Sequence, residues 1–149
     1  MKLEGTYTFQ AKREEIWDLL MDPAVIARTV PGCEEMTSVG EDLYEAKMTV
    51  GIAAVKGVYT SKISLLDKVP PESYKLKLEG KGARGFLTGE VSIRLEERDE
   101  STVLHYTAEN HIGGPIAAVG QRIVGAAAKM FVNQGFKSLE KQLRERRKG

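Results

Sequence analysis

Residues 74–112 read YKLKLEGKGARGFLTGEVSIRLEERDESTVLHYTAENHI, with apolar and polar side chains alternating almost throughout. Alternation with a period of two is typical of strands that are buried on one face only. Two short breaks, near residues 83–85 and 98–101, divide the stretch into strands at about 74–82, 86–97 and 102–112. Because short turns can join only antiparallel neighbours, these three strands are expected to form a meander.

The same alternation extends toward the N-terminus, with strands expected at 2–10, 34–39, 44–52 and 55–67. Between the first two of these, residues 12–21 change to a helical period, and a second short helix should run from Pro23 to about Arg28, capped by Asp22. After Gly113-Gly114-Pro115 the sequence predicts one continuous helix to about Arg146. This order indicates an α+β fold with a seven-stranded antiparallel sheet.

One helix about 10–12 Å across is too narrow for a flat sheet of seven strands, which would be roughly 30 Å wide. The sheet is therefore expected to curve around the long C-terminal helix, or else the two short helices must seal one end. The helix face expected to meet the sheet is rich in small residues, namely Ala117, Ala118, Gly120, Gly125, Ala126, Ala127, Ala128 and Gly135. Small residues there favour an internal apolar cavity, or else a closer approach of helix and sheet.

If the space is a cavity, its wall should consist of the inward-facing side chains of the sheet and the helix. The expected wall residues are Met48, Val50, Tyr59, Ile63, Leu76, Leu78, Val91, Ile93, Tyr106, Ala108, Asn110, Ile123, Ala127 and Met130. Asn110 could orient a ligand carbonyl or hydroxyl, or could instead bond to backbone at the strand end. For the apolar members the alternative is ordinary core packing.

The composition is that of a globular domain: 149 residues, 42% apolar, 29% charged, with a net charge of +1. This length indicates one domain, residues 1–149, and the balanced charge argues against nucleic-acid binding. A single cysteine excludes an internal disulfide, and two histidines make a Cys/His zinc site improbable. Without an apolar signal region or spanning segment, a cytoplasmic location is expected.

Four further features are candidates for sites. Gly80–Gly85 satisfies G-x-G-x-x-G, but a strand rather than a helix is expected to follow it, which argues against dinucleotide binding. His105, Glu109 and His111 share a strand face that should point outward. Cys33 is expected to be a partly buried structural thiol. Residues 137–149 carry six basic and two acidic side chains, suiting either weak contact with an anionic membrane or a solvated helix end.

Several stretches, taken in order, carry a family resemblance: Met1–Gly5, Glu15–Trp17, Asp22-Pro23, Val30–Glu34, Val55–Gly57, Pro70–Tyr74, Gly80–Gly82 with Gly85-Phe86, Gly113–Pro115 and Gly120–Arg122. Over essentially residues 1–142 the chain resembles the G-subunit family of carbon monoxide dehydrogenase, within the START-like (SRPBCC) superfamily. The resemblance implies a helix-grip fold, a cavity for a lipid- or cofactor-type molecule under the long helix, and no conserved catalytic triad. It also implies a role in attaching a molybdenum hydroxylase to the membrane or to its electron acceptor.

Three functions follow as hypotheses. The first is a non-enzymatic accessory protein that binds a hydrophobic small molecule, quinone or lipid-like, and is peripheral at the inner face of the membrane. The second is a small cyclase- or hydrolase-like enzyme, which would need a titratable group inside the cavity. From the expected facing, only Tyr hydroxyls, Asn110 and Ser61 point inward. The third is a structural adaptor with a filled core, which binds partners through its surface.

Overall fold

The computed structural model describes residues 2–51 and 56–148, and its elements follow the expected order. These elements are β1 (Lys2–Phe9), α1 (Arg13–Met21), α2 (Pro23–Thr29), β2 (Cys33–Gly40), β3 (Leu43–Val50), β4 (Gly57–Val69), β5 (Ser73–Gly82), β6 (Gly85–Arg98), β7 (Ser101–Gly113), the 3-10 helix η2 (Pro115–Val119) and α3 (Gln121–Lys148). The expected end of the 44–52 strand and start of the 55–67 strand lie outside the described residues.

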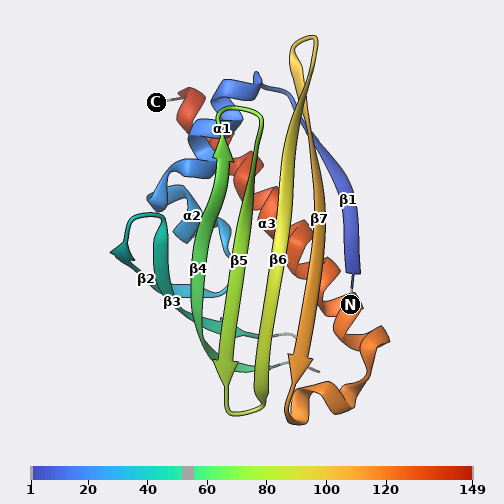
Figure 1. The fold of residues 1–149 in the computed structure, drawn as a ribbon. Coiled ribbons are helices and arrows are strands. Elements are labelled where there is room, and N and C mark those ends of the chain that lie inside the picture. Colours follow the sequence, from blue (N-terminus) through green and yellow to red (C-terminus); the bar gives the residue numbers. More distant parts are fainter. Residues whose placement is uncertain (1, 52–55, 149) are drawn as a thin grey trace.

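The seven strands form one antiparallel sheet in the order β1-β7-β6-β5-β4-β3-β2. Figure 1 shows the sheet curving around α3, which crosses it diagonally, while α1 and α2 lie together at one end. The predicted α+β class, the curved sheet and its seven antiparallel strands are confirmed. The curvature follows from the need to bury a wide apolar sheet face against a single long helix.

The C-terminal helix differs from the prediction in one respect. Instead of running continuously from Pro115, it is split into η2 and α3 at Gly120. The backbone of Gly120 has a φ of +92°, in the left-handed region that favours glycine, and Gly114 before η2 has a φ of +82°. Near the start of the chain, the predicted cap of α2 is present, because the Asp22 side chain accepts a hydrogen bond from the Ala24 amide at 3.0 Å.

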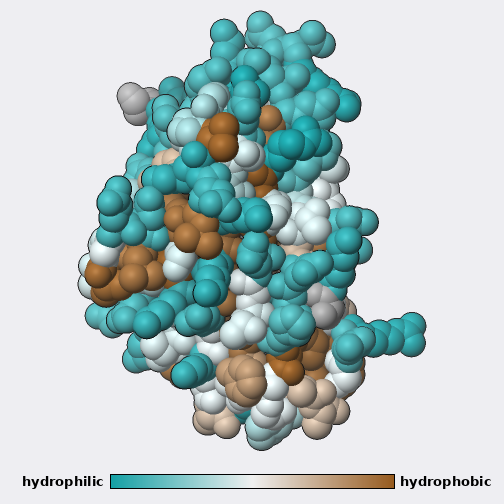
Figure 2. Space-filling view, viewed as in Figure 1, coloured by the Kyte–Doolittle hydropathy of each residue, from teal (hydrophilic) through white to brown (hydrophobic). Residues whose placement is uncertain are grey.

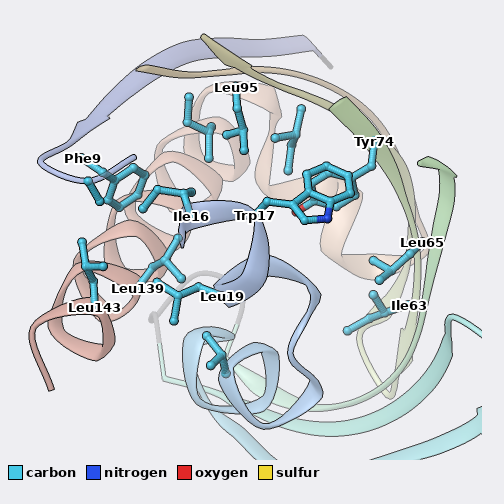
Figure 3. Close-up of a cluster of buried hydrophobic side chains, with 14 of the residues drawn as sticks. Phe9, Ile16, Trp17, Leu19, Ile63, Leu65, Tyr74, Leu95, Leu139 and Leu143 are labelled. Atoms are coloured by element: carbon cyan, nitrogen blue, oxygen red, sulfur yellow. The ribbon is translucent and has the colours of Figure 1, made fainter. Parts of the chain in front are cut away.

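The densest packing lies where α1 and the C-terminal half of α3 meet the sheet. Figure 3 shows Ile16 and Leu19 of α1 among Phe9, Leu95, Leu139 and Leu143, with Trp17 beside Tyr74 of β5. The rings of Trp17 and Tyr74 meet edge to face, with centroids 5.5 Å apart. This end of the space between sheet and helix is filled by side chains.

The basic C-terminal residues belong to the last turns of α3. Arg146 pairs with Asp22 at 2.7 Å, and Arg147 pairs with Glu15 at 3.2 Å and donates to the Gln10 carbonyl at 2.8 Å. These contacts tie the helix end to the segment around α1. Each exposed pair contributes at most about 1 kcal/mol, but together with Arg144, which pairs with Glu140 at 3.8 Å, three of the six basic side chains of residues 137–149 are engaged within the molecule.

Candidate ligand-binding cavity

A cavity of about 400 Å³ lies between the concave face of the sheet and α3, and it borders the dense core, because Leu19, Tyr74 and Leu139 of that core also line it. Its volume is within the range of about 300–1,000 Å³ typical of small-molecule sites. The sheet supplies one wall, α3 the opposite wall, and α1 and α2 close one end. The lining is almost wholly apolar, which suits a hydrophobic occupant.

Three glycines on the inner face of the sheet leave room for side chains of neighbouring strands. Gly80 of β5 lines the cavity, and Gly89 of β6 lies directly under Asn110 of β7. A Cβ atom added to Gly89 would be 2.3 Å from Asn110 Oδ1. Gly82 is crossed in the same way by the ring of Tyr59, whose Cδ1 would be 2.9 Å from an added Cβ. These glycines thus admit side chains from neighbouring strands.

Ten of the fourteen expected wall residues line this cavity. They are Met48, Val50, Tyr59, Ile63, Leu76, Leu78, Val91, Ala108, Asn110 and Ala127. Ile93 and Tyr106 also lie on the inner face of the sheet, but outside the cavity. Ile93 is buried in the core, and Tyr106 is covered by Phe136 of α3, with ring centroids 5.5 Å apart. The structure brings the ten residues together around one space, and a binding role for them stays a prediction.

The expectation for Ile123 and Met130 is wrong. Both side chains are 50% exposed and neither lines the cavity. Ala127 and Ala128 face the cavity as expected, and the rest of the cavity-facing side of α3 is formed by Val124, Phe131, Val132 and Leu139. Ala117, Ala118, Gly120 and Ala126, expected on the inner face, are exposed. Val124 thus lines the cavity where Ile123 was expected to do so.

Sequence reasoning missed the contribution of the two short helices to the wall. Leu19 and Leu20 of α1 and Val25, Ile26, Thr29 and Val30 in and after α2 line the cavity. Their apolar spacing was visible, and one of the two expected alternatives was that these helices seal one end of the sheet. What the sequence did not indicate was that these apolar side chains would line the cavity as well as belong to the core or pack against it.

The polar groups in the wall are few, and several are engaged. Ser61 donates to the sulfur of Met48 at 3.3 Å, and Asn110 and Tyr59 each interact with another part of the protein. Burial raises the pKa of Tyr59 and, more strongly, that of Tyr74, so both phenols stay protonated at neutral pH. The only ionisable carboxyl in the described lining is that of Glu79, an exposed residue. That lining therefore contains no buried acid–base pair.

The other candidate sites lie away from the cavity. His105, Glu109 and His111 are on the outer face of the sheet, as predicted. His105 Nε2 is 2.8 Å from Glu96 Oε1, and the hydrogen bond from His105 lowers the pKa of that carboxyl. Cys33 is half-buried, and burial raises the pKa of its thiol, which disfavours the reactive thiolate.

The glycine-rich motif Gly80–Gly85 spans the turn between β5 and β6. Because a strand follows this motif, it offers no helix N-terminus to a pyrophosphate. Across residues 2–51 and 56–148, no three His, Cys, Asp or Glu side chains gather as metal ligands would. In the same residues, no helix is both long enough and apolar enough to cross a membrane.

A second depression, of about 770 Å³, lies on the outer face of β1, β7, β6 and β5. Its side chains are mainly polar, including Thr6, Lys75, Ser92, Arg94 and Thr107. The molecular face in Figure 2 is correspondingly mostly hydrophilic, with separate apolar patches. We place the candidate site in the smaller interior cavity, because enclosed apolar spaces with few polar groups are typical of small-molecule sites.

Comparison with known proteins agrees with this geometry. Residues 5–144 match the CoxG family, described as the G subunit of carbon monoxide dehydrogenase. The chain belongs to this family. A conserved protein from Geobacillus kaustophilus is 38% identical, with 97% of this chain and 96% of that chain covered and a TM-score of 0.95. No curated protein matches.

More distant structures share the fold of this CoxG family member. A START superfamily protein from Mycobacterium smegmatis is 14% identical, with 97% of each chain covered and a TM-score of 0.72. The ZhuI aromatase/cyclase from Streptomyces sp. R1128 is 18% identical, with coverage of 98% of this chain and 94% of that chain and a TM-score of 0.70. The START-like, helix-grip fold expected from the resemblance is thereby confirmed.

Proposed function

We propose that this protein is a non-catalytic accessory protein that binds a hydrophobic small molecule, quinone or lipid-like, in the cavity under α3. The observation that carries the proposal is the apolar space of about 400 Å³ between a glycine-containing sheet wall and the Ala127-Ala128 stretch of α3. Apolar surface that lines this space without an occupant stays in contact with water, which is unfavourable in free energy. An apolar ligand would recover part of that free energy on binding.

The partner we propose is a molybdenum hydroxylase of the carbon monoxide dehydrogenase type. Membership of the CoxG family supports this partner, because the family is described as a subunit of carbon monoxide dehydrogenase. In this role the protein would link the enzyme to the membrane or to its electron acceptor. Contact with an anionic membrane through residues 137–149 would rely on the basic side chains outside the Arg146 and Arg147 ion pairs, such as Lys137 and Lys141.

Native mass spectrometry of the purified protein, before and after extraction with organic solvent, tests the binding role. We expect an adduct of several hundred daltons that disappears on extraction, and its recovery in the extract would identify the ligand. A bare protein mass, combined with no binding of added quinones or lipids, would overturn the proposal in favour of a structural adaptor. Co-purification with a molybdenum hydroxylase, or its failure in a strain that expresses both, tests the partner separately.

A further inference from the structure

The buried hydroxyl-bearing residue Tyr74 makes no side-chain hydrogen bond to another described residue, and burial alone raises the pKa of its phenol. Tyr74 lines the cavity and is only 3% exposed. Its ring is held edge to face against Trp17, with a centroid separation of 5.5 Å (Figure 3). Nearly all buried tyrosine hydroxyls have a hydrogen-bond partner, because burying a polar group unbonded is unfavourable. A phenol in the wall of an apolar space is therefore available to an occupant that carries an acceptor atom.

Thr29 of α2, which is partly exposed, supplies a second donor. It lines the cavity, and its Oγ1 accepts a hydrogen bond from Gln142 Nε2 at 3.1 Å. Gln142 is 7% exposed, so this amide is fixed within the helix packing. With the Gln142 amide donating to Oγ1, the free function of the hydroxyl is to donate its own proton. In the part of the chain that the structure describes, that proton has no acceptor.

The charges of the cavity wall limit the ligand further. No Lys, Arg or His side chain belongs to the described lining, so a carboxylate or phosphate group would be buried there without a counter-charge. Burial of an unpaired ion is far more unfavourable than burial of a neutral polar group. Ser61, which already donates to Met48, adds no free donor.

We propose that Tyr74 and Thr29 are specificity-determining residues that donate hydrogen bonds to an acceptor oxygen, carbonyl or ether, of an uncharged apolar ligand. This inference rests on the proposed function and narrows its ligand class. Neutral carbonyl compounds should bind more tightly than hydrocarbons of the same shape. Anionic lipids and other carboxylates should be rejected.

The test uses three probes that share one ring system: 9-fluorenone, fluorene and fluorene-9-carboxylate. We expect 9-fluorenone to bind about fivefold to tenfold more tightly than fluorene, which corresponds to one net hydrogen bond, and the carboxylate to bind least. Tyr74→Phe removes the hydroxyl and keeps the ring. It should abolish most of the preference for 9-fluorenone and leave the affinity for fluorene unchanged. Tyr44→Phe is the matched control, because Tyr44 is buried but does not line the cavity.

Infrared spectroscopy supplies a readout that a structural role would not move. The carbonyl stretch of bound 9-fluorenone should lie at lower frequency in the wild-type protein than in Tyr74→Phe. Thr29→Val should weaken the same preference, and Thr29→Ser should restore it. Equal binding of 9-fluorenone and fluorene, unaltered in Tyr74→Phe, would overturn the inference while leaving the cavity function intact. Failure of both neutral probes to bind would instead count against the proposed function itself.

Discussion

Replacement of Ala127 by leucine should stabilise the protein and block its binding site at the same time. Ala127 is 7% exposed and faces the cavity from α3. Leucine adds three carbons at this position, and burying them contributes about 0.8 kcal/mol each, or roughly 2.4 kcal/mol. The restricted rotamers of a buried leucine cost about 0.5–1 kcal/mol of this. The net expectation is a gain of about 1.5 kcal/mol, which raises Tm by about 3–6 °C at this chain length.

Thermal unfolding followed by circular dichroism measures the gain, and titration with fluorene measures the loss of binding. Ala126→Leu is the matched control, because Ala126 is the preceding residue of the same helix and is exposed. It should leave both Tm and fluorene affinity nearly unchanged. A loss of about 1–3 kcal/mol in Ala127→Leu, the usual result of overpacking, would refute the reasoning. It would mean that the side chains around Ala127 already fill the space.

Three other changes test separate parts of the structure. Gly89→Ala should destabilise the fold by about 1–3 kcal/mol in urea unfolding, because its Cβ meets Asn110, and adding Asn110→Ala should recover part of that loss. The hydrogen bond to Glu140 raises the pKa of Tyr7, so its stabilising contribution is complete below about pH 10 and lost as pH rises through the folded-state pKa. In Tyr7→Phe the free energy of unfolding should fall less as the pH rises above about 10. A pH dependence of unfolding identical to that of the wild-type protein would contradict the assignment. Arg147→Ala should lower the free energy of unfolding by at most about 1 kcal/mol, and by less at high salt. A double-mutant cycle with Glu15→Ala, measured by urea unfolding, should show a coupling energy only at low salt.

The sheet could be predicted because each strand carries a strong signal of period two. One face of β6 carries Leu87, Val91, Ile93 and Leu95, and the other face is polar or charged except at Phe86. A shift by one residue would expose the whole apolar set, so the facing of such a strand is fixed by its sequence. This explains why, of the strand residues expected in the wall, only Ile93 and Tyr106 lie elsewhere. Both face inward but are covered by the filled core.

Which face of α3 packs against the sheet could not be predicted as firmly as the facing of the strands. Alanines and glycines occur on both sides of its N-terminal half, so the contrast between an apolar and a polar face is weak. Ile123 and Met130 are the large apolar residues that suggested the wrong face. The break at Gly120 also separates η2 from α3, so the period counted from Pro115 does not continue into the helix. The facing of α3 follows from tertiary contacts that local sequence does not reveal, such as the hydrogen bond from Gln142 to Thr29 of α2 and the burial of Leu139 in the core.

Stability and binding are assigned to opposite halves of the same helix. Leu139 and Leu143, which are 1% and 3% exposed, pack among large side chains near α1, whereas Ala127 and Ala128 face open space. Close packing stabilises a fold, and a cavity of about 400 Å³ gives up part of that stabilisation. The chain can leave its wall unfilled because the other half of α3 anchors the helix independently. A ligand bound under Ala127 then adds to the stability of a structure that already holds its shape, so binding requires no folding step.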